Sequence, residues 1–473
     1  MSKMLVPIAI SSIILVSKVS LFYLYRKYRL KYFKKLGIPG PDPHWFYGNL
    51  GELWSTDSRH ILISNWTKKY GKIFGYYEGS TPVLVISDVE DIERLCIKQM
   101  NDFPRRVTLP FAPDPHKFPN SPLANIGTLW GTEWKRLRTI CNSGFSTGKL
   151  KQYQNLIQKS QVSLIELLME ETNRDDLINI FDVFRFLTLD VIAEVAFGVE
   201  LNSIKHRGED NPILSKFEVL LKTVIAEGWS IKLGLCLPEL KMVLQTMALF
   251  LMKFKIGILA SFHGLSQVCE SVIDTRMENP ELRRKDILQL LIDASEKKDK
   301  QYAPLNKNEI ISQCIQFFGA GFGTTSTTLG YIAHLLADHP EVQRKLYDEL
   351  MQLDGENLDY DNVMNKLPYL DWVIHETIRM YPIGIGQVNR QPVDDGVQLG
   401  GVPISKDAEV LVDIYSVHNN PTFWGPVDPS QFHPERFSPE YPTTATRPTA
   451  AFLGFGLGPR HCIGKTLFLN YFY

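Results

Sequence analysis

Hydrophobic positions are densest at the start of the chain. From Met4 to Tyr25 the sequence is apolar apart from a few serines and Lys18. At about 1.5 Å per residue, a helix of this length can cross a hydrocarbon core of roughly 30 Å. Basic residues crowd positions 26–35, whereas only Lys3 precedes the apolar run. Because positive flanks stay in the cytoplasm, we predict that residues 1–35 form a transmembrane signal anchor, with a cleaved signal peptide as the alternative.

Turn residues and periodicity divide the rest of the chain. Residues 36–50 are dense in proline and glycine, which predicts a stiff linker. A Gly-Ser-Thr-Pro turn at 79–82 lies within β-rich sequence and predicts a hairpin. From Asp88 to about Pro382 the periodicity is mostly helical, and mixed strand and loop sequence follows. We therefore predict that residues 51–473 form one mainly α (α+β) domain with small sheets.

A second apolar stretch runs from Met242 to Phe262. Lys253 and Lys255 interrupt it, so we do not expect a second membrane span. A helix at the membrane face or at a channel mouth is one interpretation, and an ordinary core helix is the other.

Composition and charge exclude several classes of protein. The chain has 473 residues, 44% of them hydrophobic, which is enough for a large core. Its formal net charge of -1 provides no basic field for nucleic acid. The six cysteines include no CxxC pair, which argues for a reducing compartment and against a disulfide framework or zinc module.

Three short patterns imitate catalytic motifs. Residues 144–148, GFSTG, match a nucleophile elbow, but helical sequence precedes them where that motif needs a strand. Residues 319–323, GAGFG, lie inside a helical run and lack the spacing of a dinucleotide fingerprint. The pair His375-Glu376 has no second histidine at zinc-protease spacing. We predict no chemistry from these patterns.

Three other motifs fit one another. The segment ETIR places Glu376 and Arg379 on one face of a helix. The segment HPERF supplies Arg436 from a loop that can reach back to this pair. Near the end of the chain, the arrangement FxxGxRxCxG is formed by Phe455, Gly458, Arg460, Cys462 and Gly464.

In this order and spacing, the motifs make the chain resemble the cytochrome P450 family, most closely its microsomal eukaryotic members. The resemblance covers nearly all of the sequence. It implies a predominantly helical prism with a smaller β-rich lobe that encloses one haem b. It also implies a haem-thiolate monooxygenase that inserts one oxygen atom from O₂ into a lipophilic substrate.

Cys462 is the residue to which the resemblance assigns the iron. Haem iron that cleaves an O–O bond favours an axial thiolate, and a free thiol needs stabilisation to ionise near neutral pH. Cys462 lies where a glycine-rich turn runs into a helix N-terminus, where backbone N–H groups can point at sulfur. Gly458 and Gly464 allow close approach of the backbone. The alternative is an inert buried thiol.

The haem propionates require cations or hydrogen-bond donors. Trp134 and Arg138, four residues apart on one helical face, are assigned to them by the resemblance, together with Arg460. Arg390 is a less specific candidate, with a solvated loop arginine as the alternative. The resemblance makes Glu376, Arg379 and Arg436 a structural ion network behind the haem.

Thr324 matches the family's proton-delivery threonine. The segment around it reads AGFGTT, so Gly323 replaces the acid that usually precedes this threonine. General acid–base help is typically worth roughly a hundredfold to ten-thousandfold in rate. Loss of the acid therefore favours slow or uncoupled turnover unless water or another group substitutes. A hydroxyl bonded back to a helix carbonyl is the structural alternative for Thr324, and both roles can coexist.

The resemblance also implies a membrane setting and partners. It predicts a single-pass protein of the endoplasmic reticulum membrane, with the catalytic domain on the cytoplasmic face. Electrons would come from NADPH-cytochrome P450 reductase, with cytochrome b5 as a second candidate donor. Lys135, Arg136 and Lys465 are candidate docking cations for an acidic partner.

The expected pocket is mainly apolar. It draws on the loop 111–126, the helix around 317–320 and the stretch 383–386. Only eleven residues follow Cys462, so we expect the family's C-terminal helix and hairpin to be incomplete. Phe468 stands where the family usually has alanine against the porphyrin. A haem-binding or haem-free inactive relative, or a truncated product without catalysis, is therefore the alternative function.

Overall fold

The computed structural model describes residues 2–108, 110, 112–173, 177–206, 229–254, 259–296, 303–353, 366–384 and 388–472. They form two compact units. Unit 1 draws on Met1–Phe111, Glu227–Gln245 and Asn389–Ser416. Unit 2 draws on Ala112–Ala226, Thr246–Val388 and Val417–Tyr473. The predicted boundaries at residues 35 and 50 both fall within unit 1.

Unit 1 contains the predicted hairpin. Strands β1 (Ile73–Glu78) and β2 (Thr81–Ile86) pair antiparallel around Gly79, whose φ of 60° is in the left-handed region that favours glycine. Strand β5 (Glu409–Val412) pairs parallel with β2, which gives the order β1-β2-β5. The hairpin prediction is confirmed. The interior of both strands is buried on both faces, which explains their continuous apolar runs.

Short helices cover this sheet. They include α3 (Leu50–Trp54), α4 (Arg59–Tyr70), α5 (Val89–Glu93) and α10 (Trp229–Cys236). A core cluster joins Leu53 and Trp66 of these helices to Phe74 and Val85 of the sheet. Strands β3 (Val397–Leu399) and β4 (Val402–Ile404) form a separate two-stranded sheet.

The proline- and glycine-rich segment 36–50 is packed against β1. The Gly75 N–H donates to the Pro39 carbonyl oxygen at 2.9 Å. A Cβ atom at Gly40 would lie 1.9 Å from the Gly75 carbonyl oxygen, so only glycine fits there. Further along, the Asn49 N–H donates to the Tyr77 oxygen at 2.7 Å. The predicted stiff linker therefore does not stand free of the body, because it satisfies backbone groups at the edge of β1.

Helix α1 (Ser2–Arg29) covers the predicted anchor, and α2 (Tyr32–Lys35) follows it. The side chains of residues 2–12 and 15, which make up part of the predicted span, lie outside the described part of the chain. Among the described residues, no helix combines the length and apolar character that a membrane crossing needs.

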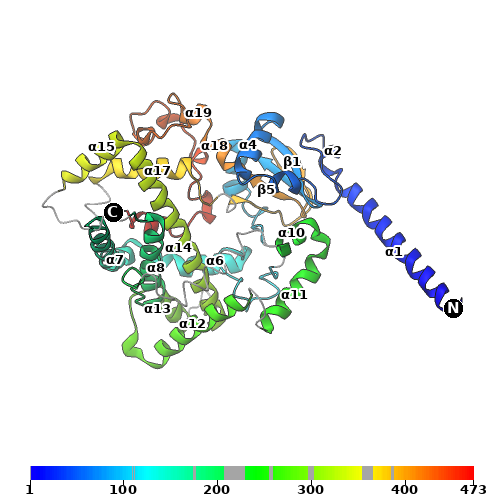
Figure 1. The fold of residues 1–473 in the computed structure, drawn as a ribbon, viewed down its shortest axis with the longest axis horizontal. Helices are drawn as coiled ribbons and strands as arrows, with labels where there is room; N and C mark the ends of the chain where they lie inside the picture. The colour runs from blue at the N-terminus through cyan, green and yellow to red at the C-terminus, as the bar shows by residue number, and fades with distance from the viewer. Residues whose placement is uncertain are drawn as a thin grey trace. The chain divides into compact units, whose positions relative to one another are not determined.

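Unit 2 is built from long helices around α14 (Lys307–Asp338). Asn306 and Glu309 form a capping box at its start. Figure 1 shows α8 (Ile180–Phe197) beside α14, and a Cβ atom at Gly321 of α14 would lie 2.7 Å from Cδ1 of Ile192. Other long helices among the described residues include α6 (Gly131–Asn142), α7 (Thr147–Asn173), α12 (Leu259–Glu278), α13 (Ile287–Glu296), α15 (Pro340–Met351) and α17 (Pro368–Met380).

The second apolar stretch, 242–262, falls on α11 (Lys241–Lys253) and the start of α12, and residues 255–258 lie outside the described part. Met242, Met247 and Phe250 are 79%, 52% and 57% exposed. The core-helix interpretation is therefore wrong for α11. The membrane-face interpretation stays a prediction.

The remainder of unit 2 is made of short elements. They are α19 (Pro421–Trp424), η6 (Pro434–Phe437), η8 (Thr449–Ala451), η9 (Gly458–Arg460) and α20 (Lys465–Leu469), while α18 (Ile414–His418) lies on the border between the units. The predicted class, mainly helical with a smaller part that carries strands, is confirmed.

Two of the segments that match catalytic motifs in sequence have the structures that we predict for them. Residues 144–148 follow α6 through the 3₁₀ turn η2 (Ser143–Phe145), so no strand precedes the serine. Residues 319–323 lie within the unbroken helix α14. Neither segment has the geometry of the motif that it imitates.

Candidate haem site

The cysteine loop between η8 and α20 folds tightly on itself. The Cys462 N–H donates to the Phe455 oxygen at 2.8 Å, and Gly456 and Gly458 have φ values of 76° and 70°. These left-handed positions explain the glycines of the motif. Cys462 is exposed, whereas the other five cysteines are buried. Cys462 is therefore not a buried thiol.

Space at the sulfur depends on Gly464. A Cβ atom there would lie 4.0 Å from the Cys462 sulfur and 3.9 Å from the Phe145 ring. A larger side chain at this position would begin to fill the space beside the thiol. Helix α20 begins at the next residue, Lys465, as the sequence predicts.

Helix α6 brings Trp134 and Arg138 to this loop. The Arg460 guanidinium carbon lies 4.9 Å from the centre of the Trp134 ring, and both side chains are buried. Nη2 of Arg460 donates to the Leu129 oxygen at 2.7 Å. Nη1 of Arg138 donates to the His461 oxygen at 3.0 Å. Three of the four predicted propionate residues therefore lie together beside Cys462.

The charges at this site favour an anion. Burial lowers the pKa of Arg138, and the opposing attraction to the sulfur of Cys462 raises it. Because the attraction is mutual, the guanidinium also favours the thiolate form of Cys462. Arg138 and Arg460 thus provide two cations beside one thiol.

Arg390, the fourth predicted residue, belongs to unit 1. Its side chain is 2% exposed, so the alternative of a solvated loop arginine is wrong. Its backbone pairs with that of Val410. The N–H of the next residue, Gln391, donates to the Arg105 oxygen at 2.9 Å. The role of Arg390 toward a propionate stays a prediction.

Sequence reasoning did not single out Arg105 or Arg106 in unit 1. Burial raises the pKa of the Cys96 thiol, and the charges of Arg390 and Arg106 oppose this shift. Arg106 and Arg390 therefore act on the same buried thiol. In the sequence, the pair of adjacent arginines in the segment DFPRRV could have indicated these two residues.

The predicted ion network is fully buried in unit 2. Glu376, Arg379 and Arg436 each have an exposed fraction of 0%. The Glu376 carboxylate accepts from Nε and Nη2 of Arg379 at 2.6 and 2.8 Å, and from Nε of Arg436 at 3.1 Å. It also accepts from the His433 N–H at 3.1 Å. One carboxylate therefore holds two buried cations.

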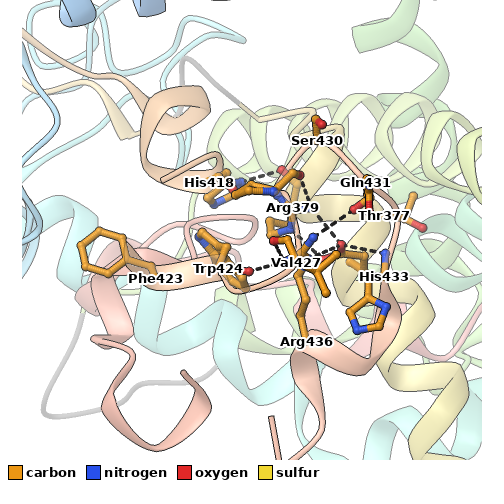
Figure 2. Close-up of polar contacts among 12 residues, drawn as sticks. Thr377, Arg379, His418, Phe423, Trp424, Val427, Ser430, Gln431, His433 and Arg436 are labelled. Atoms are coloured by element: carbon orange, nitrogen blue, oxygen red, sulfur yellow. Dashed lines mark hydrogen bonds and ion pairs between the residues drawn. The ribbon is translucent and has the colours of Figure 1, made fainter. Parts of the chain in front are cut away.

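The two arginines also donate hydrogen bonds to loop carbonyls. Figure 2 shows Arg379 and Arg436 among His418, Trp424, Val427 and His433. Arg379 donates to the oxygens of His418 and Pro429 at 2.7 and 2.8 Å. Arg436 donates to the oxygens of Trp424 and, at 2.7 Å, Val427. The network therefore fixes the long loop between α18 and η6.

His418 connects this network to the cysteine loop. Its Nδ1 atom donates to the Arg379 oxygen at 2.9 Å, and its Nε2 atom accepts from the Leu453 N–H at 2.9 Å. Burial lowers the pKa of His418 to about 3, so the ring is neutral near pH 7. Leu453 lies at the start of the cysteine loop. His418 therefore connects the Glu376 network to this loop, and sequence reasoning missed this residue.

Thr324 lies on α14 with an exposed side chain. Its hydroxyl donates to the Ala320 oxygen at 2.7 Å, which confirms the expected back-bond. A Cβ atom at Gly323 would have no heavy atom within 4 Å. The helix is continuous here, and the missing acid leaves open space beside Thr324.

Other predicted residues have mixed outcomes. Arg136 is already paired, with Glu133 at 3.0 Å and with Glu309, whereas Lys135 is exposed. Phe468 packs edge-on against Phe455 at 5.3 Å between ring centres. Residues 111, 385 and 386 of the expected substrate pocket lie outside the described residues, so the pocket stays a prediction.

Comparison with known proteins agrees with this geometry. The family described as Cytochrome P450 matches residues 38–467. Cytochrome P450 3A12 of Canis lupus familiaris is 33% identical over 455 residues, which are 96% of this chain and 86% of that protein. Cytochrome P450 3A18 of Rattus norvegicus is 33% identical over 460 residues, with shares of 96% and 87%. Lithocholate 6-beta-hydroxylase of Mesocricetus auratus is 31% identical over 458 residues, with shares of 96% and 86%.

The chain belongs to the cytochrome P450 family. It is a monooxygenase whose cofactor is haem b, with a cysteine thiolate as ligand to the iron. The donor set in unit 2 fits this group, because an exposed thiol, two cations and a tryptophan side chain lie near a glycine. As in the family generally, redox partners and lipophilic substrates are implied.

Proposed function

We propose that Cys462 is the axial ligand of the haem iron and that unit 2 carries the monooxygenase chemistry. The observation that supports this most strongly is the meeting of the exposed Cys462 thiol with Trp134, Arg138 and Arg460. Haem with a thiolate ligand supplies the activation of O₂. The surrounding residues hold the thiol and its loop in place.

Each neighbouring residue has a distinct task. Arg138 stabilises negative charge at the Cys462 sulfur and at a propionate. Arg460, fixed by the Leu129 carbonyl, presents its remaining donors to a propionate together with the N–H of Trp134. Arg390 stays a candidate for the same role by family resemblance alone, and in unit 1 its buried guanidinium donates to the Asn389 oxygen at 2.9 Å.

Thr324 is proposed to hold and pass protons at its Oγ1 atom. The Thr324 hydroxyl donates its hydrogen bond to the Ala320 oxygen. The lone pairs of Oγ1 can therefore accept a hydrogen bond from water or another donor. The open space at Gly323 leaves room for water in place of the family's acid. We therefore expect turnover with part of the electrons lost to side reactions.

NADPH-cytochrome P450 reductase is the proposed electron donor, with cytochrome b5 as a second candidate. Lys135 and Lys465 are the proposed docking cations, since they flank the site on α6 and α20. Arg136 is removed from this set, because its charge is matched by Glu133 and Glu309.

The proposed substrate class is lipophilic, and the proposed location is the endoplasmic reticulum membrane with the catalytic domain on the cytoplasmic face. The apolar part of α1, followed by Lys27, Lys31, Lys34 and Lys35, supports a membrane location. One relative is named for the hydroxylation of lithocholate, so lithocholate is a reasonable first probe.

The rival is an inactive relative, and the absence of an acid at Gly323 favours it. The full chain should be expressed and reconstituted with reductase, NADPH and lithocholate. We expect haem uptake, a reduced carbon monoxide complex that absorbs at the position typical of thiolate ligation, and NADPH consumption that depends on reductase. Haem uptake without NADPH consumption on any lipophilic probe would favour the rival.

A further inference from the structure

A buried ion pair joins helix α1 to the turn between α10 and α11 in unit 1. Arg26 lies in the basic stretch after the apolar part of α1, yet its side chain is 0% exposed. Its Nε and Nη2 atoms donate to the two carboxylate oxygens of Glu239, each at 3.0 Å. Glu239 lies in η3 (Pro238–Leu240). Such bidentate pairs fix orientation as well as distance.

Carbonyl and aromatic groups complete the surroundings of Arg26. The guanidinium also donates to the oxygens of Phe46 and Cys236. The rings of Phe22 and Phe46 lie 5.1 and 5.5 Å from its central carbon. Arg26 therefore joins α1, the segment before α3 and the end of α10.

The β1–β2 hairpin holds Glu239 from another side. The Ser80 hydroxyl donates to Glu239 at 2.7 Å. A Cβ atom at Gly79 would lie 2.3 Å from the Leu235 oxygen, so the hairpin turn touches the end of α10. Burial raises the pKa of Glu239, but the hydrogen bonds from Arg26 and Ser80 lower it overall, which keeps the carboxylate charged.

The joined elements carry exposed side chains of three kinds. On α1, Leu21 and Leu24 are 66% and 59% exposed, and beside Glu239, Leu240 and Met242 are 41% and 79% exposed. The exposed aromatic and basic residues of the same region include Tyr23, Tyr25, Tyr28, Trp45, Lys27, Lys31, Lys34 and Lys35. Apolar side chains bordered by aromatic rings and lysines match the interface of a bilayer with anionic lipids.

We propose that Arg26, Glu239 and Ser80 form a clamp that positions α1 and the start of α11 for simultaneous contact with an anionic lipid surface. The inference rests on the membrane association of the proposed function, and it adds how two separate segments bind as one surface. Without the clamp, α1 keeps its apolar side chains, but the positions of Leu240 and Met242 relative to α1 are no longer fixed.

The test compares full-length variants on vesicles of phosphatidylcholine with and without phosphatidylserine. Hydrogen exchange of residues 237–245 and the vesicle-bound fraction are measured. Arg29→Gln is the matched control, because Arg29 lies on the same helix but pairs with Asp407 at the surface, where the two side chains are 27% and 53% exposed. It removes the same charge and leaves the clamp intact.

We expect vesicles to slow exchange at 237–245 in the parent and in Arg29→Gln. In Arg26→Gln this protection should disappear, and the partition coefficient should fall on the order of tenfold, because apolar side chains leave the lipid. Glu239→Gln should behave in the same way. Ser80→Ala leaves the Arg26–Glu239 ion pair in place and should therefore lose less of the protection and of the vesicle binding. This variant keeps the test valid if the other variants lose their haem.

Two kinds of failure are distinguishable. If the parent does not bind vesicles, the membrane association is wrong and the clamp proposal with it. If the parent binds and all clamp variants show parental protection at 237–245, the clamp is wrong while the association stands. Protection that appears without vesicles at high protein concentration would assign the surface to a second copy of the chain and overturn the lipid assignment.

Discussion

Neutralising Glu376 should strongly destabilise the region that supports the cysteine loop. In Glu376→Gln the two guanidinium groups of Arg379 and Arg436, both with 0% exposure, lose their shared counter-charge. The new amide would also place a donor against one of them. Removing one partner of a buried ion pair typically costs about 3–5 kcal/mol.

That loss is large compared with the stability of a whole domain, which is about 5–15 kcal/mol. The four hydrogen bonds to the Glu376 carboxylate place this substitution toward the upper part of the range. Urea unfolding of the haem-loaded protein, followed by haem absorbance, should show a much lower midpoint for Glu376→Gln.

The matched control is Arg344→Gln on α15. Arg344 pairs with Asp348 at 3.1 Å, but the two side chains are 75% and 56% exposed. Exposed pairs are worth about 0–1 kcal/mol, so this variant should unfold almost as the parent does. If Glu376→Gln also unfolds within about 0.5 kcal/mol of the parent, the reasoning about the buried network is refuted.

Two further predictions concern His418 and Gly323. The pKa of His418 is lowered by burial to about 3 from 6.5, so between these values the unfolded chain binds the extra proton. His418 should therefore cost about 1.4 kcal/mol of stability per pH unit as the pH falls below 6.5, and His418→Gln should remove this slope in unfolding curves. A slope that is unchanged in the variant would contradict a neutral buried ring. Gly323→Glu should fold, because a Cβ atom there meets no heavy atom within 4 Å, and it should increase the product formed per NADPH. Unchanged coupling would show that the missing acid does not limit proton delivery.

The sequence allowed the prediction of features that depend on short-range patterns. The hairpin at Gly79, the long helix around Thr324 and the ExxR helix follow from periodicity and turn residues. The meeting of Trp134 and Arg138 with Arg460 was predicted only by family resemblance, since more than three hundred residues separate α6 from the cysteine loop. Periodicity carries no information about which helices meet.

Contacts to backbone carbonyls could not be predicted. His418 and Arg26 have no distinctive sequence context, and their positions depend on the Arg379 oxygen and the Cys236 oxygen. The packing of segment 36–50 on β1 was also missed, because proline and glycine indicate stiffness but not what the chain touches. The pairing of Arg136 was missed for a similar reason, because its partner Glu309 lies far away in the sequence.

The most direct test of the account is the absorption spectrum of the reduced, carbon monoxide-bound protein, measured on the full chain and on Cys462→Ala. We predict that the parent absorbs at the position typical of thiolate-ligated haem. Cys462→Ala should lose this band, while a variant of another thiol, Cys96→Ala, should keep it. A thiolate band that survives in Cys462→Ala, or a parent that binds haem without one, would contradict the assignment of Cys462 to the iron.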